Sequence, residues 1–299
     1  MSLAPLVIIN PAAGDGRARR SVAWMRERLA ARPEARLEVT RRAGDAEALA
    51  ADAVQHGHDR VIAVGGDGTV QEVVNGLLSG SEPASMGIVP LGSGNDLARS
   101  LALPAELATA WTTAIGHVTR RIDVARARNG AGDLRWFASA GGIGFDAQVA
   151  AAMADRSGWQ AGRAGYLLTT LTELRRFENR HIRLTIDGQT ETGDMLFVAI
   201  ANGAYYGGGM RIAPGAHVDD GLVDVCVVGD ISRLTVLRQL PNLYRGTHVN
   251  HPAVSMRSGS IIEADSDDAT RIHLDGEPFG SLPLHVTVGL RTLAVAAAE

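Results

Sequence analysis

Short apolar runs of β-type residues alternate with helical patterns through the first 120 residues of the chain. Residues 6–9, 36–40, 60–64 and 86–89 have the composition of strands, and residues 17–31, 45–55 and 69–78 have the spacing of helices. Strands and helices that alternate at this length predict a parallel sheet covered by helices on both faces. The ligand site of such a sheet lies at the carboxyl ends of its strands. Every glycine cluster of the first hundred residues falls at such an end.

The pattern changes after about residue 121 to turn-rich strands, which predict a mainly antiparallel β domain. The expected strands are residues 122–128, 134–140, 182–186, 195–201, 222–228, 271–274 and 284–288. Two helices interrupt them, at residues 161–178 and 232–244, and the acidic segment 258–270 is expected to be a loop. We therefore expect an α/β domain over residues 1–122 and a β-rich domain over residues 123–289. Residues 290–299 are a candidate segment that returns to the first domain.

The chain contains no lysine, because all 29 of its basic Lys and Arg residues are arginine. A Walker-type phosphate loop, a pyridoxal Schiff base and the usual protein-kinase phosphate site each require a lysine. These three classes are excluded. If the protein binds phosphate, it does so with backbone amides, arginine and metal.

Charge and composition exclude further classes. A formal net charge of −4 predicts no overall attraction to nucleic acid or to an acidic membrane. A 4% share of aromatic residues argues against recognition of bases by stacking on aromatic side chains. The single cysteine, Cys226, allows neither an internal disulfide nor a thiolate zinc site. No apolar run approaches the roughly 20 residues that span a bilayer, and no basic leader precedes the first apolar run. We expect a cytoplasmic protein.

The sharpest motif is Gly65-Gly66-Asp67-Gly68-Thr69, which links the apolar run 61–64 to a helix. Consecutive glycines at a helix N-terminus expose several backbone amides to one point, which is an anion site. Asp67 suits a phosphate that carries Mg2+, and Thr69 can cap the helix and contact an oxygen. The alternative is a plain strand–helix turn with an aspartate cap, although ordinary turns rarely need three glycines.

Two other loops fall at the same predicted edge. The segment 90–96, Pro-Leu-Gly-Ser-Gly-Asn-Asp, supplies amides, one hydroxyl and a candidate helix cap. The segment 10–14, Asn-Pro-Ala-Ala-Gly, places Asn10 either in contact with a ligand or in the closure of its own turn. Together with the first motif, these loops predict three walls of one site.

Carboxylates gather in two places in the second half of the chain. Asp275 and Glu277 flank Gly276 after a β-type run, where they either serve a reacting hydroxyl or form a solvated turn. Segment 217–222, His-Val-Asp-Asp-Gly-Leu, offers a carboxylate and carbonyls that suit Mg2+ or Ca2+, or is likewise a solvated turn. Helix 163–178 either docks on a membrane or packs against the core.

Six segments, in this order and spacing, resemble the diacylglycerol-kinase-type catalytic domain, whose family includes bacterial lipid kinases, sphingosine kinases and ceramide kinases. They are NPAAG, GGDGTVQEVVNGLL, GIVPLGSGNDLARSL, SAGGIGFDAQV, VAIANGAYYGGGMRIAPGAHVDDGLVDV and HLDGEP. The resemblance covers nearly the whole chain. It implies an ATP-dependent kinase with a nucleotide-binding domain similar to NAD kinase and phosphofructokinase, followed by a C-terminal β-sandwich.

The resemblance also implies residue roles. Glu277 matches the family's proton acceptor, with Asp275 in support, and the ATP phosphates would lie on the glycine loop with Asp67 toward the metal. Gln71 and Ser93 stand where the family usually has Asn and often has Thr, and both keep the hydrogen-bonding chemistry. The implied nucleotide-binding residues are Thr40, Gly65, Gly66, Asp67, Gly68, Thr69, Val70, Gln71 and Ser93, joined by Asn10 from the loop pattern. The implied divalent-ion site is the Asp220 side chain with main-chain oxygens of His217 and Leu222.

The resulting hypothesis is a kinase that transfers the γ-phosphate of Mg-ATP to a lipid alcohol, with Glu277 as general base. An NAD kinase-like enzyme is an alternative, against which the 90–96 loop and the terminal Asp-Gly-Glu argue. A non-catalytic lipid-binding regulator is another, and a dehydrogenase is disfavoured because no G-x-G-x-x-G follows the first strand. The sequence leaves the lipid open. A lipid substrate implies transient contact with a membrane surface, although the chain shows no anchor, and exposed strands of the β-rich domain could pair two subunits in a homodimer.

Overall fold

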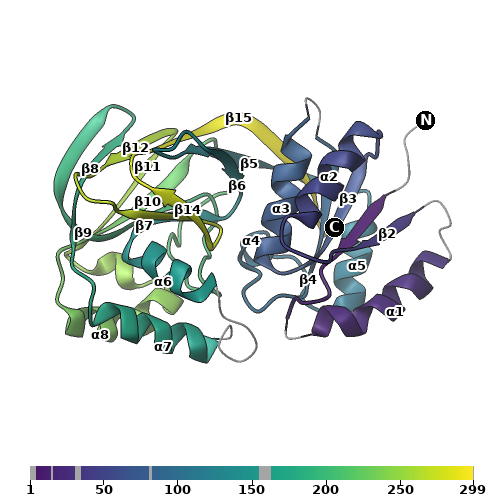
Figure 1. Ribbon diagram of the computed structural model, residues 1–299, viewed down its shortest axis with the longest axis horizontal. Helices are drawn as coiled ribbons and strands as arrows, with labels where there is room; N and C mark the ends of the chain where they lie inside the picture. The colour runs from purple at the N-terminus through teal and green to yellow at the C-terminus, as the bar shows by residue number, and fades with distance from the viewer. Residues whose placement is uncertain (1–4, 15, 31–34, 81–82, 155–162, 299) are drawn as a thin grey trace. The chain divides into compact units, whose positions relative to one another are not determined.

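The computed structural model describes residues 5–14, 16–30, 35–80, 83–154 and 163–298. The chain divides into two compact units, one ending at Ile122 and taking up the chain again at Thr292, the other running from Asp123 to Arg291. The chain enters the second unit within strand β5 (Thr119–Arg128) and leaves it within β15 (Leu284–Ala296) (Figure 1).

The first unit is an α/β domain built on a parallel sheet. Its sheet order is β15-β4-β3-β1-β2, and each neighbouring pair is parallel. Its elements are β1 (Leu6–Ile9), α1 (Arg17–Ala30), β2 (Arg36–Val39), α2 (Asp45–Gln55), β3 (Arg60–Gly65), α3 (Asp67–Leu78), β4 (Ser85–Pro90), α4 (Asp96–Ser100) and α5 (Leu107–Ile115). The predicted fold class is confirmed for this unit.

Alternation of side chains along the strands gives this sheet two buried faces. Val7 and Ile62 belong to the apolar cluster that packs against α1 and α5, through residues such as Met25 and Trp111. Helices α2 and α3 cover the other face (Figure 1). They approach so closely that a Cβ on Gly76 would lie 2.3 Å from the carbonyl oxygen of Glu47. Continuous burial of the strands explains their unbroken apolar sequence.

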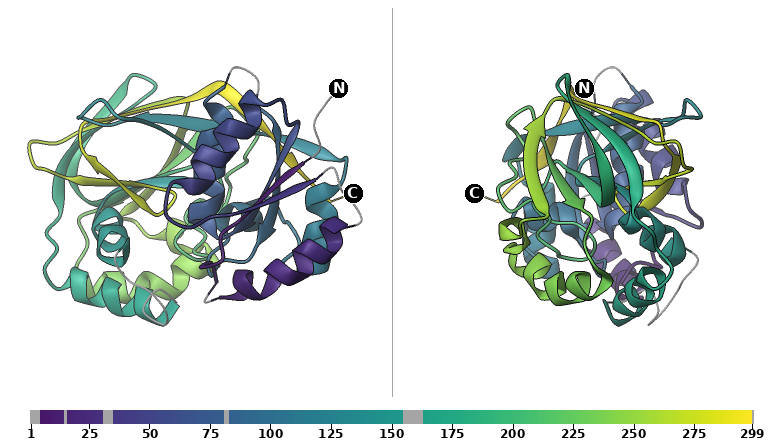
Figure 2. Two further views of the ribbon diagram at one scale, coloured as in Figure 1. Left: turned by 45° about the vertical axis from the view of Figure 1, so that its right-hand side comes forward. Right: turned by 90° about the vertical axis from the view of Figure 1, so that its left-hand side faces the viewer.

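The second unit is antiparallel β with helices gathered on one side of its sheet (Figure 2). Strands run in the order β14-β13-β7-β9-β8-β12-β15, β10 pairs with β9 and β11, and β5 pairs with β6. Its strands beyond β5 and β15 are β6 (Leu134–Phe137), β7 (Ala140–Gly144), β8 (Arg180–Ile186), β9 (Gln189–Ala201), β10 (Val223–Gly229), β11 (Val254–Gly259), β12 (Ile261–Asp265), β13 (Arg271–Leu274) and β14 (Glu277–Ser281). Its helices are α6 (Phe145–Ala154), α7 (Arg163–Leu174) and α8 (Arg233–Arg245), with a 3-10 turn at His248–Asn250. This half of the predicted fold class is also confirmed.

Several elements differ from the sequence prediction. The expected strand 134–140 is two strands, β6 and β7, because the chain turns at Ala138 and Ser139. The expected loop 258–270 contains β12, in which buried Ile262 and Ala264 alternate with exposed Glu263 and Asp265. Its acidic outer face hid a period-two pattern. Helices α4, α5 and α6 were also missed. Residues 161–162 of the predicted helix 161–178 lie outside the described residues.

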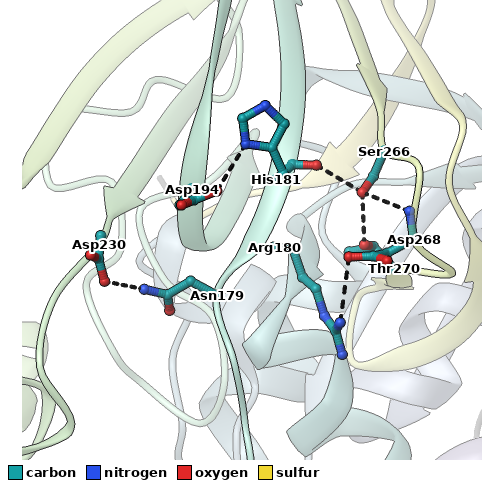
Figure 3. A network of polar contacts seen from close by, with 8 residues as sticks. All are labelled: Asn179, Arg180, His181, Asp194, Asp230, Ser266, Asp268 and Thr270. Carbon is teal, nitrogen blue, oxygen red and sulfur yellow. Dashed lines mark hydrogen bonds and ion pairs between the residues drawn. The ribbon is translucent and has the colours of Figure 1, made fainter.

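The polar end of segment 258–270, which follows β12, is held to β8 by hydrogen bonds (Figure 3). The hydroxyl of Ser266 donates to the carbonyl oxygen of His181 at 2.8 Å and accepts from the backbone N–H of Asp268. Arg180 reaches the Asp268 carboxylate, and His181 faces Asp194. These polar contacts order a segment that has few apolar residues to bury. Within the described part of the chain, none of the helices is both long enough and apolar enough to cross a membrane.

Candidate active site

The loops that follow β3 and β4 are tied together at the carboxyl edge of the parallel sheet. The backbone N–H of Leu91 donates to the carbonyl oxygen of Gly65 at 2.7 Å. The Asp67 carboxylate accepts from the backbone N–H groups of Asn95, at 2.7 Å, and Asp96, at 2.6 Å. The strand order β4-β3-β1 brings these loops and the loop after β1 to one edge, as the sequence predicts.

The glycines of these loops are required by close packing. A Cβ on Gly92 would lie 2.4 Å from the Cα of Gly66, and a Cβ on Gly65 would lie 2.4 Å from the Oγ1 of Thr69. Real side chains do not tolerate such distances. The glycine pattern therefore lets the two loops lie backbone to backbone at the N-terminus of α3.

The side chains of Asn10 and Thr69 join the first loop to α3. The Oδ1 atom of Asn10 accepts from the backbone N–H of Ala12, which closes its own turn, and its Nδ2 donates to the Thr69 Oγ1 at 3.2 Å. Helix α3 begins at Asp67 with Gly66 as its N-cap residue and no side-chain cap. The expectation that Thr69 caps this helix is wrong, because the helix begins two residues earlier and Thr69 lies inside its first turn.

The remaining predicted nucleotide residues are distributed unevenly around this edge. Thr40 follows β2 and is buried, and its backbone N–H donates to the carbonyl oxygen of Ile9. Val70 and Gln71 are also buried, on α3, whereas Ser93 is exposed at the tip of its loop. Ser93 is thus the one of these four side chains that stands open to solvent.

Two arginines that the sequence reasoning missed hold the loops in place. Arg17 donates from Nη2 to the carbonyl oxygen of Gly92 at 2.6 Å and from Nε to that of Gly14. Arg99 donates from Nε to the carbonyl oxygen of Gly94 at 2.8 Å. The only signal was their place next to the glycine loops, since the partner carbonyls are backbone atoms that carry no sequence signature.

The electrostatics of this edge favour a bound cation beside a bound anion. Burial raises the pKa of the Asp67 carboxyl above its ordinary value, while its amide hydrogen bonds and Arg99 act in the opposite direction. A desolvated carboxylate gains from a nearby Mg2+. The first amides of a helix have no acceptor in a preceding helical turn, which makes the N-terminus of α3 suited to phosphate oxygens. The residues present therefore fit a Mg2+-bound phosphate.

In the second unit, the turn between β13 and β14 gives its two carboxylates different surroundings. The Asp275 carboxylate accepts from the backbone N–H groups of Ala138, Ser139 and Ala140, at 3.2, 3.0 and 2.9 Å. The Glu277 side chain is exposed at the first position of β14. Asp275 thus anchors the turn, whereas the carboxylate of Glu277 is accessible to a reactant.

The predicted divalent-ion segment lies on the surface of the same unit. The Oδ1 atom of Asp220 accepts from the backbone N–H of Leu222 at 3.0 Å, and His217, Asp220 and Leu222 are all exposed. Burial raises the pKa of Asp224, and the negative charge of Asp220 raises it further. In the described ranges, no group of three or more His, Cys, Asp or Glu side chains is arranged to bind a metal, so main-chain oxygens would complete this site.

Comparison with known proteins identifies both halves of the chain. Residues 4–127 match the family model of the diacylglycerol kinase catalytic domain, and residues 139–297 match that of the YegS C-terminal NAD kinase beta sandwich-like domain. A diacylglycerol kinase of Mycobacterium tuberculosis (strain H37Rv) is 32% identical over 283 residues, 94% of this chain and 90% of the relative. A Chromohalobacter salexigens protein described as "Probable lipid kinase YegS-like" is 34% identical over 245 residues, 81% and 77% of the two chains. The crystal structure of a Bacillus anthracis diacylglycerol kinase shares the fold, with a TM-score of 0.75, 23% identity and coverage of 99% and 97%.

Proposed function

Because this chain belongs to the diacylglycerol kinase family of lipid kinases, we propose that it transfers the γ-phosphate of Mg-ATP to the hydroxyl of a lipid alcohol. The observation that carries the proposal is that the two carboxylates of the β13–β14 turn have different surroundings. Asp275 is engaged by three backbone amides, and beside it Glu277 presents an exposed carboxylate.

Glu277 acts on the acceptor. Its carboxylate orients the lipid hydroxyl and takes the hydroxyl proton as the oxygen attacks the γ-phosphorus. A new P–O bond forms to the lipid oxygen, the bond between the γ-phosphorus and the bridging oxygen breaks, and ADP leaves with that oxygen. The exposure of Glu277 supports this role, because a proton acceptor must be open to its substrate.

The first unit binds the nucleotide. The amides of the first turn of α3, next to Gly65, Gly66 and Gly68, would hold phosphate oxygens, and Asp67 would supply the carboxylate for the metal. Thr40, Gln71 and Ser93 complete the nucleotide contacts in this proposal, with Asn10 and Thr69 shaping the loop. When bound, Mg2+ would offset negative charge on the phosphates. No lysine is required.

The test is transfer of radioactive phosphate from ATP to a panel of lipid alcohols in mixed micelles. The panel contains diacylglycerol, phosphatidylglycerol, a sphingoid base and a long-chain isoprenoid alcohol, with NAD as the competing acceptor. We expect label in one lipid, loss of label in Glu277→Gln and full label in Glu263→Gln, an exposed glutamate of the same unit. Label in NAD alone, ATP binding without turnover, or full activity of Glu277→Gln would contradict the proposal.

We further propose that α8 makes the contact with the membrane surface. Its exposed apolar residues Leu234, Leu237 and Tyr244, which are 55%, 37% and 42% exposed, recur at three and seven residues and share one helix face. The helix carries Arg233, Arg238 and Arg245 and no acidic residue. An apolar stripe with flanking arginines is complementary to an anionic bilayer, into which such a helix inserts its apolar face.

Sedimentation with lipid vesicles tests this docking face. We expect the protein to sediment with vesicles of phosphatidylglycerol and phosphatidylcholine, and much less with phosphatidylcholine alone. The double variant Leu234→Glu/Leu237→Glu loses sedimentation, while Leu134→Glu, at an exposed leucine of β6, does not. Unchanged sedimentation of the double variant, or its conversion from a dimer to a monomer in solution, would assign α8 another role.

A further inference from the structure

A buried histidine–aspartate pair lies directly behind the β13–β14 turn. His273 on β13 and Asp146 on α6 are only 4% and 6% exposed, and the Nε2 of His273 lies 3.3 Å from the Oδ2 of Asp146. The phosphoryl transfer proposed above uses neither residue. His273 stands four positions before Glu277 in the chain, so whatever fixes the ring acts close to the proposed base.

The contacts of the ring determine which of its nitrogens carries the proton. The Nδ1 of His273 lies 3.3 Å from the backbone nitrogen of Gly276. A backbone N–H can only donate, so Nδ1 must be the unprotonated acceptor, and the ring proton is on Nε2, facing the Asp146 carboxylate. The other oxygen of Asp146 accepts from the backbone N–H of Ala147 at 2.8 Å. A chain of hydrogen bonds thus runs from α6 through the ring to the Asp275–Gly276 peptide, one residue before Glu277.

The surrounding residues leave the pair little freedom. A Cβ on Gly142 of β7 would lie 1.9 Å from the Oδ2 of Asp146 and 2.4 Å from the Nε2 of His273, so no other residue fits at this position without displacing the pair. The ring of Tyr206 stacks on the imidazole, with centroids 6.3 Å apart and an interplanar angle of 20°. Nearby Cys226 stays a neutral thiol, since burial, with a smaller contribution from Asp146, raises its pKa to about 12.

The turn itself needs such an anchor. Asp275 and Gly276 both have positive φ, 48° and 87°, a conformation that costs energy for the non-glycine residue. Asp275 is held by three amides on one side of the turn, and the His273 ring holds the Gly276 N–H on the other. The direction of the next residue, Glu277, follows from these two attachments.

We infer that the His273–Asp146 pair is a positioning device that sets the Gly276 peptide, and through it the Glu277 carboxylate, for accepting the proton of the lipid hydroxyl. The inference rests on the proposed role of Glu277. Errors of about 1 Å in the placement of a reacting group can cost about 100-fold in rate, so loss of the Gly276 contact acts on kcat rather than on ATP binding.

Two substitutions of His273 separate positioning from simple filling of the core. In His273→Asn the side-chain oxygen can take the place of Nδ1 and accept from Gly276, whereas in His273→Gln the side-chain nitrogen takes the place of Nε2 and donates to Asp146. We expect His273→Asn, which keeps the Gly276 contact and loses the Asp146 contact, to lower kcat about 3- to 10-fold. His273→Gln, which loses the Gly276 contact itself, should lower kcat roughly 30- to 100-fold, with the KM for ATP unchanged in both variants. Equal loss in both variants, or no loss in His273→Gln, would overturn the inference.

Hydrogen exchange of the Gly276 amide provides a readout that needs no enzymatic activity. The amide is expected to exchange slowly in the wild type and in His273→Asn, and faster in His273→Gln. Nitrogen chemical shifts of the ring should show Nδ1 unprotonated and Nε2 protonated at neutral pH. Fast exchange in the wild type, or a proton on Nδ1, refutes the device itself, whereas protected exchange combined with full activity of Glu277→Gln refutes the proposed function instead.

Discussion

The Asp67 carboxylate accepts a hydrogen bond from the backbone N–H of Asn95, with 2.7 Å between Oδ2 and N, and its other oxygen accepts from Asp96. Asp67 begins α3, and Asn95 and Asp96 begin α4. One side chain thus caps the N-terminus of a helix that follows a different strand. These hydrogen bonds therefore fix the two glycine loops of the proposed nucleotide site relative to each other.

Asp67→Ala should destabilise the first unit and weaken nucleotide binding together. Removal of the carboxylate leaves two backbone donors without their acceptor, at a cost of about 1–3 kcal/mol in the free energy of unfolding. Urea denaturation and calorimetric titration with Mg-ATP measure the two effects. Asp52→Ala, at an exposed aspartate of α2, is the control. Normal ATP affinity in a destabilised Asp67→Ala protein would show that the tie does not shape the site.

Gly92→Ala should abolish ATP binding without any change of charge. Its Cβ would lie 2.4 Å from the Cα of Gly66, so the two loops must separate. Gly66→Val should act the same way, since a Cβ there already lies 3.1 Å from the Cα of Gly92. Gly193→Ala, where the described residues leave the Cβ position open, should bind ATP normally. Fluorescent-nucleotide titration compares the three, and wild-type affinity in Gly92→Ala would contradict the account.

Asp275→Asn should lower the stability of the protein, whereas Glu277→Gln should remove phosphate transfer and leave stability unchanged. The asparagine at 275 loses acceptor capacity for three backbone amides and places an NH2 group against one of them, which should lower the free energy of unfolding by about 1–3 kcal/mol. Glu277→Gln should leave the melting temperature unchanged and remove phosphate transfer. Thermal denaturation and the transfer assay check both, and equal melting temperatures for the two variants would refute this division.

His248 should make stability depend on pH. Burial lowers its pKa below the ordinary value, although its contact with the carbonyl oxygen of Ile212 acts in the opposite direction. As the pH falls, His248 therefore takes up its proton in the unfolded chain before it does so in the folded protein. The contribution of neutral His248 to the free energy of unfolding is fully present above about pH 6.5 and is lost as the pH drops toward the folded pKa. His248→Gln should flatten urea denaturation midpoints between pH 7 and pH 5.5. A steeper dependence in the variant would reverse the sign of this assignment.

Local patterns were sufficient to predict the fold class and the three loops of the first unit. Strand-to-glycine-to-helix transitions are written in adjacent residues, so 61–69 and 90–96 could be interpreted without knowledge of the fold. The strand β12 was not predicted because its outer face is acidic. The helix α4 was not predicted because five residues are too few to show a helical period.

The sequence by itself determined that any binding of phosphate must do without lysine. It also indicated the glycine loops at strand ends as the candidate phosphate site, and which carboxylates are candidates for chemistry. Only the tertiary structure decided their parts. It assigned Asp67 and Asp275 to backbone amides, left Glu277 exposed, brought Arg17 onto the carbonyl of Gly92 and paired His273 with Asp146, 127 positions away. The reason is physical: partners of this kind are backbone atoms or distant side chains, and their distances are set by strand order and packing rather than by neighbouring residues.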